Sequence, residues 1–108
     1  DHLDQEPYLA YNSIYGAGRF WTVLTEEGEH FDELETVSTK AAFAWNAIFD
    51  DPFAETAFDE VLKVTRSDHG WMAGVYRDGA PNTVLTLNTN AIVLQSLAYI
   101  EFGPMHRW

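Results

Sequence analysis

The sequence predicts a mainly α-helical fold assembled from helical hairpins, with a short β-hairpin or structured loops between them. Two predicted helices, over residues 38–49 and 88–102, are apolar on nearly all sides, whereas the helix between them, over 52–63, has one apolar stripe and a charged outer face. A chain of 108 residues is too short to cover all these apolar faces by itself. We therefore expect hairpins stacked side by side, with enclosed helices inside and amphipathic helices outside, as in solenoids and closed toroids.

Each element of the first two thirds has a local signal. The first 35 residues are punctuated by glycine and proline, and they predict an ordered loop with one short strand over 19–25. Thr36 or Ser38 can cap the first helix. Asp51 suits the N-cap of the second helix and Pro52 its first position, so this helix should follow at once and complete a helical hairpin.

The last third predicts a β-hairpin or long structured loop, followed by a helix. Residues 71–76 and 83–87 flank a turn that contains Asp, Gly and Pro, a pattern typical of hairpins. Asn88 can cap the final helix, and Gly103 followed by Pro104 should end it.

Length, charge and composition limit the classes of function. A chain of this length corresponds to a single domain, 1–108, and 17 acidic against 6 basic residues give a net charge of −11, which repels nucleic acids and anionic membranes. Residues 81–100 form the longest uncharged stretch but are too polar to insert into a membrane. Cysteine is absent and the four histidines are scattered, so we expect neither a metal site nor a cofactor.

Candidate catalytic residues lie in the acidic loop that opens the chain. Asp4 and Glu6 stand two positions apart, and a pair of carboxylates in different environments can act as acid and base on a glycosidic bond. The alternative interpretation is a solvated acidic loop, because carboxylates are abundant throughout the chain.

Candidate substrate-binding residues combine flat rings with amide, hydroxyl and amine groups. This combination suits sugars, because their C–H faces stack on aromatic rings and their hydroxyls need hydrogen-bond partners. The alternative is that the rings pack in the core and the polar groups stabilise loops or cap the last helix. The candidates are Tyr8, Tyr11, Asn12, Trp21, Lys40, Trp71, Tyr76, Asn88 and Asn90.

Several stretches of the chain, read in order, resemble one bacterial family. They are DHLDQEPYLAYNSIYGAGRFW, LETVSTKAAFAWNAIFD and HGWMAGVYRDGAPNTVLTLNTNAIVLQSLAY, followed by GP. Over nearly its whole length the chain is similar to the C-terminal half of the family called domain of unknown function 3131. The segments STKAAFAW and LTLNTNAIVLQSL are the most specific parts of the resemblance.

The resemblance implies part of an α/α-toroid like that of certain glycoside hydrolases, incomplete because the N-terminal hairpins are missing. It implies that residues 1–12, 38–40, 71–76 and 88–90 face the cavity. It also implies a periplasmic or extracellular location in bacteria, beside components of exopolysaccharide synthesis or export. The missing N-terminal half or a second chain would then complete the ring.

We therefore expect a domain that either binds a polysaccharide or oligosaccharide or also hydrolyses it, with Asp4 and Glu6 as acid and base in the second case. Two other functions stay open. One is a non-catalytic carbohydrate-binding or scaffolding module of a secretion assembly. The other is a structural unit whose apolar helix faces pair with another chain or a second copy.

Overall fold

The computed structural model describes the backbone of residues 2–16 and 19–107 and the side chains of residues 2–12 and 23–107. Over these residues the fold is mixed α/β, with three α-helices beside small antiparallel sheets. The expected mainly α-helical fold, part of an α/α-toroid, is therefore wrong. The helices are α1 (Thr39–Ile48), α2 (Pro52–Val64) and α3 (Leu87–Phe102), with short 3₁₀ helices η1 (Asp32–Leu34) and η2 (Met105–Arg107).

The strands of the described residues are short and pair only with antiparallel neighbours. They are β1 (Tyr11–Gly16) with β2 (Arg19–Leu24), β3 (Thr36–Ser38) with β6 (Gly74–Tyr76) and β7 (Pro81–Asn82), and β4 (Arg66–Ser67) with β5 (Gly70–Trp71). In the three-stranded sheet, Val37 pairs with Val75, which in turn pairs with Pro81. This central sheet therefore joins the first third of the chain to the last.

The N-terminal third contains more strand than the sequence predicts. The strand expected at 19–25 is confirmed as β2, but β1, which pairs with it, replaces predicted loop. Polar Asn12 and Ser13 stand next to each other in β1, so no strict alternation of apolar and polar residues reveals the strand. The hairpin expected from 71–76 and 83–87 exists, but its strands are β6 and β7.

The helical hairpin and its stop signals are confirmed. Asp51 caps α2, because its Oδ1 accepts a hydrogen bond of 2.9 Å from the amide of Ala54, and Pro52 takes the first helical position. Gly103 ends α3 with a φ of 77°, a left-handed conformation that suits glycine. The cap of α3 is Thr86, whose Oγ1 accepts from the amide of Thr89 at 3.0 Å.

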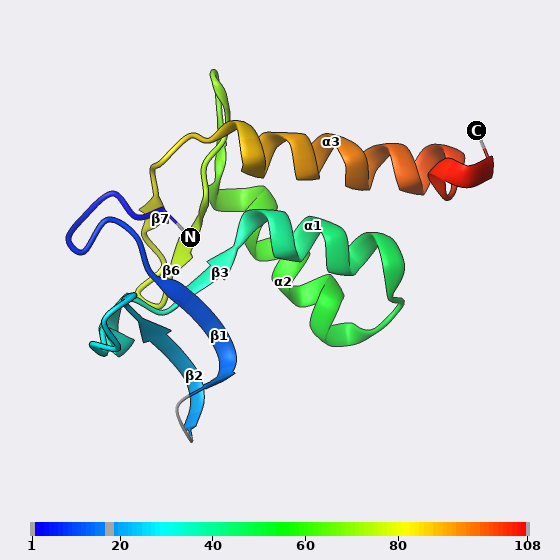
Figure 1. The fold of residues 1–108 in the computed structure, drawn as a ribbon. Helices are drawn as coiled ribbons and strands as arrows, with labels where there is room; N and C mark the ends of the chain where they lie inside the picture. Colours follow the sequence, from blue (N-terminus) through cyan, green and yellow to red (C-terminus); the bar gives the residue numbers. More distant parts are fainter. Residues whose placement is uncertain (1, 17–18, 108) are drawn as a thin grey trace.

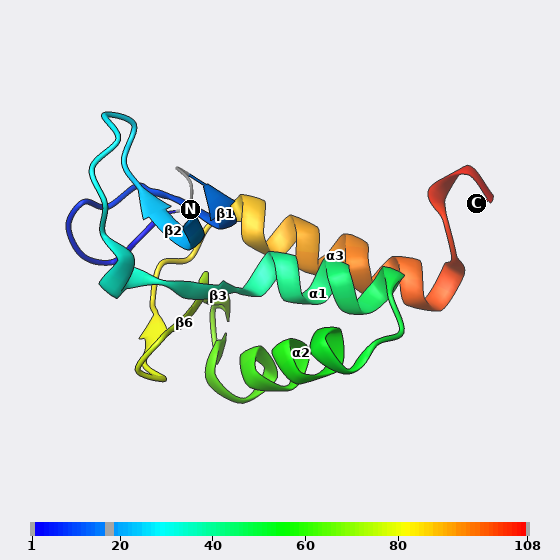
Figure 2. The same ribbon diagram turned by 90° about the horizontal axis from the view of Figure 1, so that it is seen from below.

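The helices form a row in which α1 lies between α2 and α3, with the sheets gathered at one end (Figures 1 and 2). The main core lies where the three helices meet β6, and the ring of Phe43 packs edge-on against Phe58 and Trp71, with centroids 5.0 and 4.8 Å away. A second core beneath the N-terminal loop contains Leu3, Ala10, Val23, Leu34 and Tyr76. Because the N-terminal residues build this sheet-associated core, they supply no further helices for a ring.

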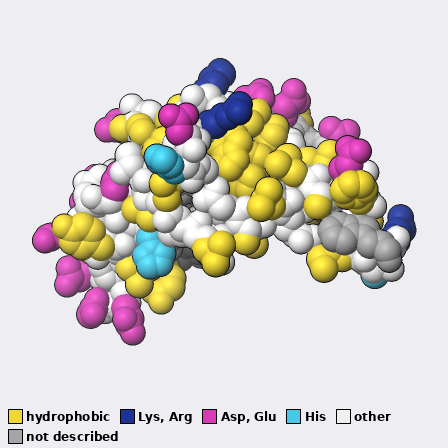
Figure 3. All heavy atoms as spheres, turned by 90° about the horizontal axis from the view of Figure 1, so that it is seen from above, with side chains coloured by type: hydrophobic (Ala, Val, Ile, Leu, Met, Phe, Trp, Pro, Cys, Tyr) yellow, Lys and Arg dark blue, Asp and Glu magenta, His cyan; other side chains and the backbone are white. Residues whose placement is uncertain are grey.

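The outward faces of α1 and α3 stay exposed. Ile48 is 61% exposed, Leu94 69% and Leu87 86%, so the enclosure expected for these two helices is not present among the described residues. Seen from above, hydrophobic side chains gather over the helical part, and most carboxylates lie along the edges (Figure 3). Within the described part of the chain, no helix is long and apolar enough to cross a membrane.

Candidate functional site

A pocket of about 360 Å³ opens where the N-terminal loop meets the first turns of α1 and α3. Four segments that are distant in sequence contribute to it. Its lining residues are His2, Leu9, Lys40, Ala73, Thr86, Asn88 and Thr89. Lys40 and Asn88 are both predicted substrate-binding residues, and the fold brings them together here.

Lys40 and Asn88 contact each other directly across the two helix starts. Each is the second residue of its helix, and the Nζ of Lys40 donates a hydrogen bond of 2.8 Å to the Oδ1 of Asn88. The first turn of a helix carries backbone N–H groups without an intrahelical acceptor. An amine, an amide and the hydroxyls of Thr86 and Thr89 therefore share one pocket, which offers a ligand both donors and acceptors.

The opening loop is held in place by long-range hydrogen bonds. Asn82 in β7 donates from its Nδ2 to the carbonyl oxygen of His2 at 2.8 Å, and its Oδ1 accepts from the amide of Asp4 at 3.2 Å. The loop also folds back on itself, because the amide of Leu3 donates to the carbonyl of Tyr8 at 2.8 Å. These contacts put His2 and Leu9 at the wall of the pocket.

Asp4 fastens the same loop to the segment that follows β7. Its Oδ2 accepts hydrogen bonds of 2.9 Å from both the amide and the hydroxyl of Thr83, and its Oδ1 accepts one of 2.5 Å from the hydroxyl of Tyr76. Tyr76, a predicted substrate-binding residue, is buried in the second core. Its hydroxyl is thus committed to the loop, and it does not line the pocket.

This arrangement keeps the Asp4 carboxylate ionised. Burial is the largest single influence and raises the pKa of Asp4, but the hydrogen bonds from Thr83 and Tyr76 together outweigh burial and hold the pKa below its ordinary value of 3.8. Burial first, and then the hydrogen bond to Asp4, raise the pKa of Tyr76 to about 12. A carboxylate with a lowered pKa holds no proton near neutral pH, so the geometry does not favour Asp4 as a general acid.

The other predicted residues of the opening loop are exposed. Glu6, the second catalytic candidate, lies at the surface, and Tyr8 and Tyr11 are 58% and 60% exposed. Tyr8 precedes Leu9 of the pocket wall and has a φ of 66°. A left-handed backbone is unusual for a bulky residue and costs energy, which marks Tyr8 as a position held in place by its surroundings.

Asn12, Asn90 and Trp71, which are predicted substrate-binding residues, join elements of the fold in the structure. Asn12 donates from Nδ2 to the carbonyl and hydroxyl oxygens of Thr36, at 2.7 and 3.1 Å, and so joins β1 to β3. Asn90 accepts from the amide of Trp71 at 2.7 Å and donates to its carbonyl at 3.1 Å, which fixes β5 against α3. Trp21 belongs to β2, and its side chain lies outside the described residues.

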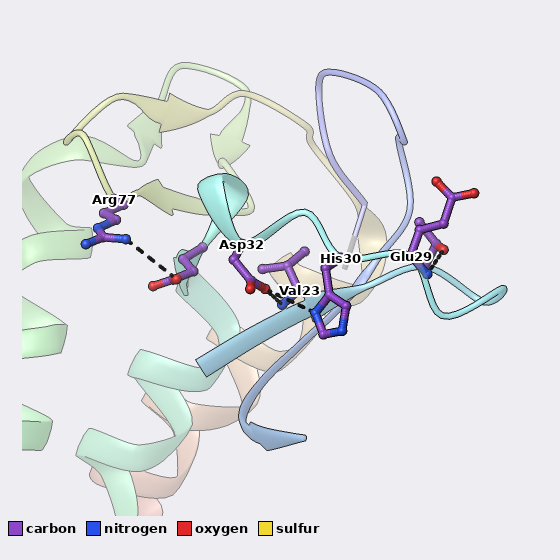
Figure 4. A network of polar contacts seen from close by, with 7 residues as sticks. Val23, Glu29, His30, Asp32 and Arg77 are labelled. Atoms are coloured by element: carbon purple, nitrogen blue, oxygen red, sulfur yellow. Dashed lines mark hydrogen bonds and ion pairs between the residues drawn. The ribbon is translucent and has the colours of Figure 1, made fainter. Parts of the chain in front are cut away.

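The acidic segment after β2 forms a local polar network (Figure 4). Asp32 accepts from the amide of Val23 at 3.1 Å and lies 3.7 Å from the Nδ1 of His30, while Glu35 lies 3.7 Å from a guanidinium nitrogen of Arg77. These contacts attach η1 to the neighbouring strand and turn. Among the described residues no group of three or more His, Cys, Asp or Glu could hold a metal ion.

The sequence identifies part of the pocket and misses the rest. Polar residues at predicted helix starts led to Lys40 and Asn88, whereas Thr86 and Thr89 are not among the predicted binding residues. His2 and Leu9 have no local signal, because they reach the pocket through contacts with residues some 80 positions away, such as the bond from Asn82 to His2.

The comparisons with known proteins identify one family. The model of the family described as "Protein of unknown function (DUF3131)" matches residues 1–103 of the chain. No curated protein and no solved structure matches it.

Proposed function

The chain belongs to the DUF3131 family, and from the geometry of its pocket we propose that it is a carbohydrate-binding domain. Its ligand is a polysaccharide or oligosaccharide that enters the pocket between the N-terminal loop and the first turns of α1 and α3. The observation that carries the proposal is the convergence of Lys40 and Asn88 on one pocket, joined at 2.8 Å.

Sugar hydroxyls need a site that both donates and accepts hydrogen bonds. The Lys40 amine donates only, the Asn88 amide does both, and the Thr89 hydroxyl can rotate to either role. The Thr86 hydroxyl, which already accepts the cap bond from the Thr89 amide, can still donate. A ligand hydroxyl can join the existing contact between Lys40 and Asn88 without leaving either group unsatisfied. The pocket therefore fits a polar, uncharged ring better than a purely apolar ligand.

Tyr8 supplies the aromatic surface that sugar recognition commonly uses. Its ring is exposed although the residue next to it, Leu9, lines the pocket, and its backbone is held in a costly left-handed conformation. An exposed ring one residue along the chain from the pocket wall offers a flat face on which the C–H groups of a sugar can stack. Tyr8 is accordingly the proposed stacking platform at the pocket edge.

The charge of the chain narrows the ligand class. A net charge of −11 creates a field that repels polyanions, so acidic polysaccharides are disfavoured unless salt screens the field. The proposed ligand is therefore a neutral glycan or one that carries amino groups. The same proposal places the protein in the bacterial periplasm or outside the cell, where exopolysaccharides are exported.

Binding without hydrolysis is the form of the proposal that the geometry supports best. The Asp4 carboxylate is occupied by Thr83 and Tyr76 and is ionised, so it is better suited to holding the loop than to donating a proton. The proposed function therefore uses Asp4 to hold the loop, and the catalytic roles of Asp4 and Glu6 stay predictions from the sequence.

The test is a titration of the protein with neutral, amino-containing and acidic glycans, followed by calorimetry or affinity electrophoresis. Lys40→Met should weaken binding about 10- to 100-fold, because a hydrogen bond from a charged group contributes about 1.5–3 kcal/mol. Lys63→Met is the matched control, since it removes the same charge from the exposed face of α2.

Two results would refute the proposal. One is the absence of binding to every glycan class in the panel. The other is an equal effect of Lys40→Met and Lys63→Met, which would show that overall charge matters and the pocket does not. Tyr8→Ala provides a separate check, because loss of a stacking ring should weaken binding without changing the preference between neutral and acidic glycans.

A further inference from the structure

The outward face of α3 is an apolar surface without cover among the described residues. Leu87 is 86% exposed and Leu94 69%, and η2 adds Met105 at 61%. Within α3 only Glu101 is charged. Ile92 and Leu97, at the flanks of this face, are also partly exposed, and contiguous exposed apolar surface is typical of protein–protein contacts.

The outward residues of α3 follow a regular pattern of large and small side chains. Leu87, Ala91, Leu94 and Ala98 are spaced by four, three and four residues, which is the spacing of the contact seam in paired helices. Leu87, Ala91 and Leu94 are exposed, and Ala98 is half-buried. These four residues, here called the seam, therefore alternate between leucine and alanine along the outward face of α3.

We propose that this face binds a second copy of the chain, with the two α3 helices antiparallel about a two-fold axis between Ala91 and Leu94. In that arrangement Leu87 faces the partner's Ala98 and Leu94 faces the partner's Ala91, so every large side chain meets a small one. The pattern is self-complementary in this register. A second copy supplies the matching surface without any further requirement.

Exposure and charge both favour a second copy as the partner of this face. The two large side chains of the seam, Leu87 and Leu94, are both more than two thirds exposed, so a matching helix can bury them. Because the seam residues themselves carry no charge, a strongly basic or acidic partner would find no ion pair there. The acidic residues of α2, Glu55, Asp59 and Glu60, lie on a different helix, so they are not brought together by the pairing of α3.

The experiment measures the mass of the purified chain by sedimentation equilibrium over a wide range of concentration and salt. The wild type should reach twice the 12.3 kDa mass of the single chain. Raising the salt concentration should strengthen the dimer, because each copy carries a charge of −11 and salt screens their repulsion.

Charge pairs at position 94 test the register. Leu94 lies beside the two-fold axis, so Leu94→Glu brings two carboxylates together and Leu94→Lys two amines, and each variant alone should be monomeric. A mixture of the two variants should form a heterodimer. Leu62→Glu on α2 is the control, since it adds a charge to an exposed leucine outside the seam, and it should leave the dimer unchanged. Circular dichroism verifies that each variant is folded.

The outcomes separate the possible occupants of the face. A wild-type chain that stays monomeric at every concentration overturns the proposal and assigns the face to another polypeptide segment or protein. A dimer that Leu94→Glu does not weaken also overturns it, because the contact then lies elsewhere. A heterodimer from the mixed variants supports both the second copy and the antiparallel register.

Discussion

Asp4 should contribute to the stability of the fold through its contacts with Thr83 and Tyr76. Asp4→Asn keeps the size of the side chain but removes its charge, and its single amide oxygen can accept from either Thr83 or Tyr76 but not from both sides. Hydrogen bonds to an ionised group contribute about 1.5–3 kcal/mol each, but Asp4 and Thr83 are exposed and water replaces part of what is lost. We expect a loss of about 1–2 kcal/mol in the free energy of unfolding.

The contribution of Asp4 to the free energy of unfolding should depend on pH in one direction. The pKa of Asp4 is lowered in the folded protein, so its contribution to stability is present above its ordinary value of 3.8 and disappears as the pH falls through the folded value. The difference between wild type and Asp4→Asn should therefore be full at neutral pH. Below pH 3.8, as the wild-type carboxylate takes up its proton, the difference should shrink.

The assay is urea unfolding followed by tryptophan fluorescence at several pH values. Asp59→Asn is the matched control, because it removes an exposed carboxylate from α2 and should change stability by less than about 0.5 kcal/mol. Equal stability of wild type and Asp4→Asn at neutral pH would refute the structural role of Asp4. A difference that stays constant into the acid range would refute its attribution to the ionised carboxylate.

Two further predictions concern the groups around this site and the β5 turn. On alkaline titration, followed by tyrosinate absorbance, Tyr76 should ionise with a pKa of about 12. The stability that the un-ionised Tyr76 confers below pH 10 should be lost between pH 10 and pH 12. A titration at the ordinary tyrosine pKa would contradict its contact with Asp4. Gly70→Ala should destabilise the protein more than Gly28→Ala in thermal unfolding. Both glycines have positive φ, but only at Gly70 would an added Cβ lie 2.8 Å from the Oδ1 of Asn90. That contact should weaken the hydrogen bond from the Trp71 amide to Asn90, which contributes about 1 kcal/mol. Equal losses of stability in the two variants would contradict this role of Asn90.

The helices could be predicted because their boundaries depend on neighbouring residues. Asp51 and Pro52 start α2 and Gly103 ends α3 through contacts within a single turn. The N-cap of α3 was harder, since several adjacent polar residues could serve. Thr86 caps, so Asn88 is the second residue of the helix and is available to Lys40.

The candidate site could be predicted only in part, because its remaining contacts join distant segments. The carboxyl of Asp4 meets Tyr76 across 72 positions and Thr83 across 79, and no local pattern encodes those meetings. From the sequence, an acidic loop next to tyrosines suggests acid–base chemistry. In the folded chain Asp4 fastens the loop, because its carboxylate already accepts hydrogen bonds from the Tyr76 hydroxyl and the Thr83 amide.

The helical ring was predicted from apolar helix faces; the structure contains those faces, but it lacks the ring that was expected to cover them. A helix that is apolar all round must be covered, but the pattern does not specify the shape or source of the cover. One row of helices leaves the outer faces of α1 and α3 open, with Trp45 45% exposed and Leu94 69% exposed. Domains usually close such a row with a second layer. The alternation of leucine and alanine along α3 adds what apolarity alone lacks, because it fits one particular partner helix, its own copy reversed.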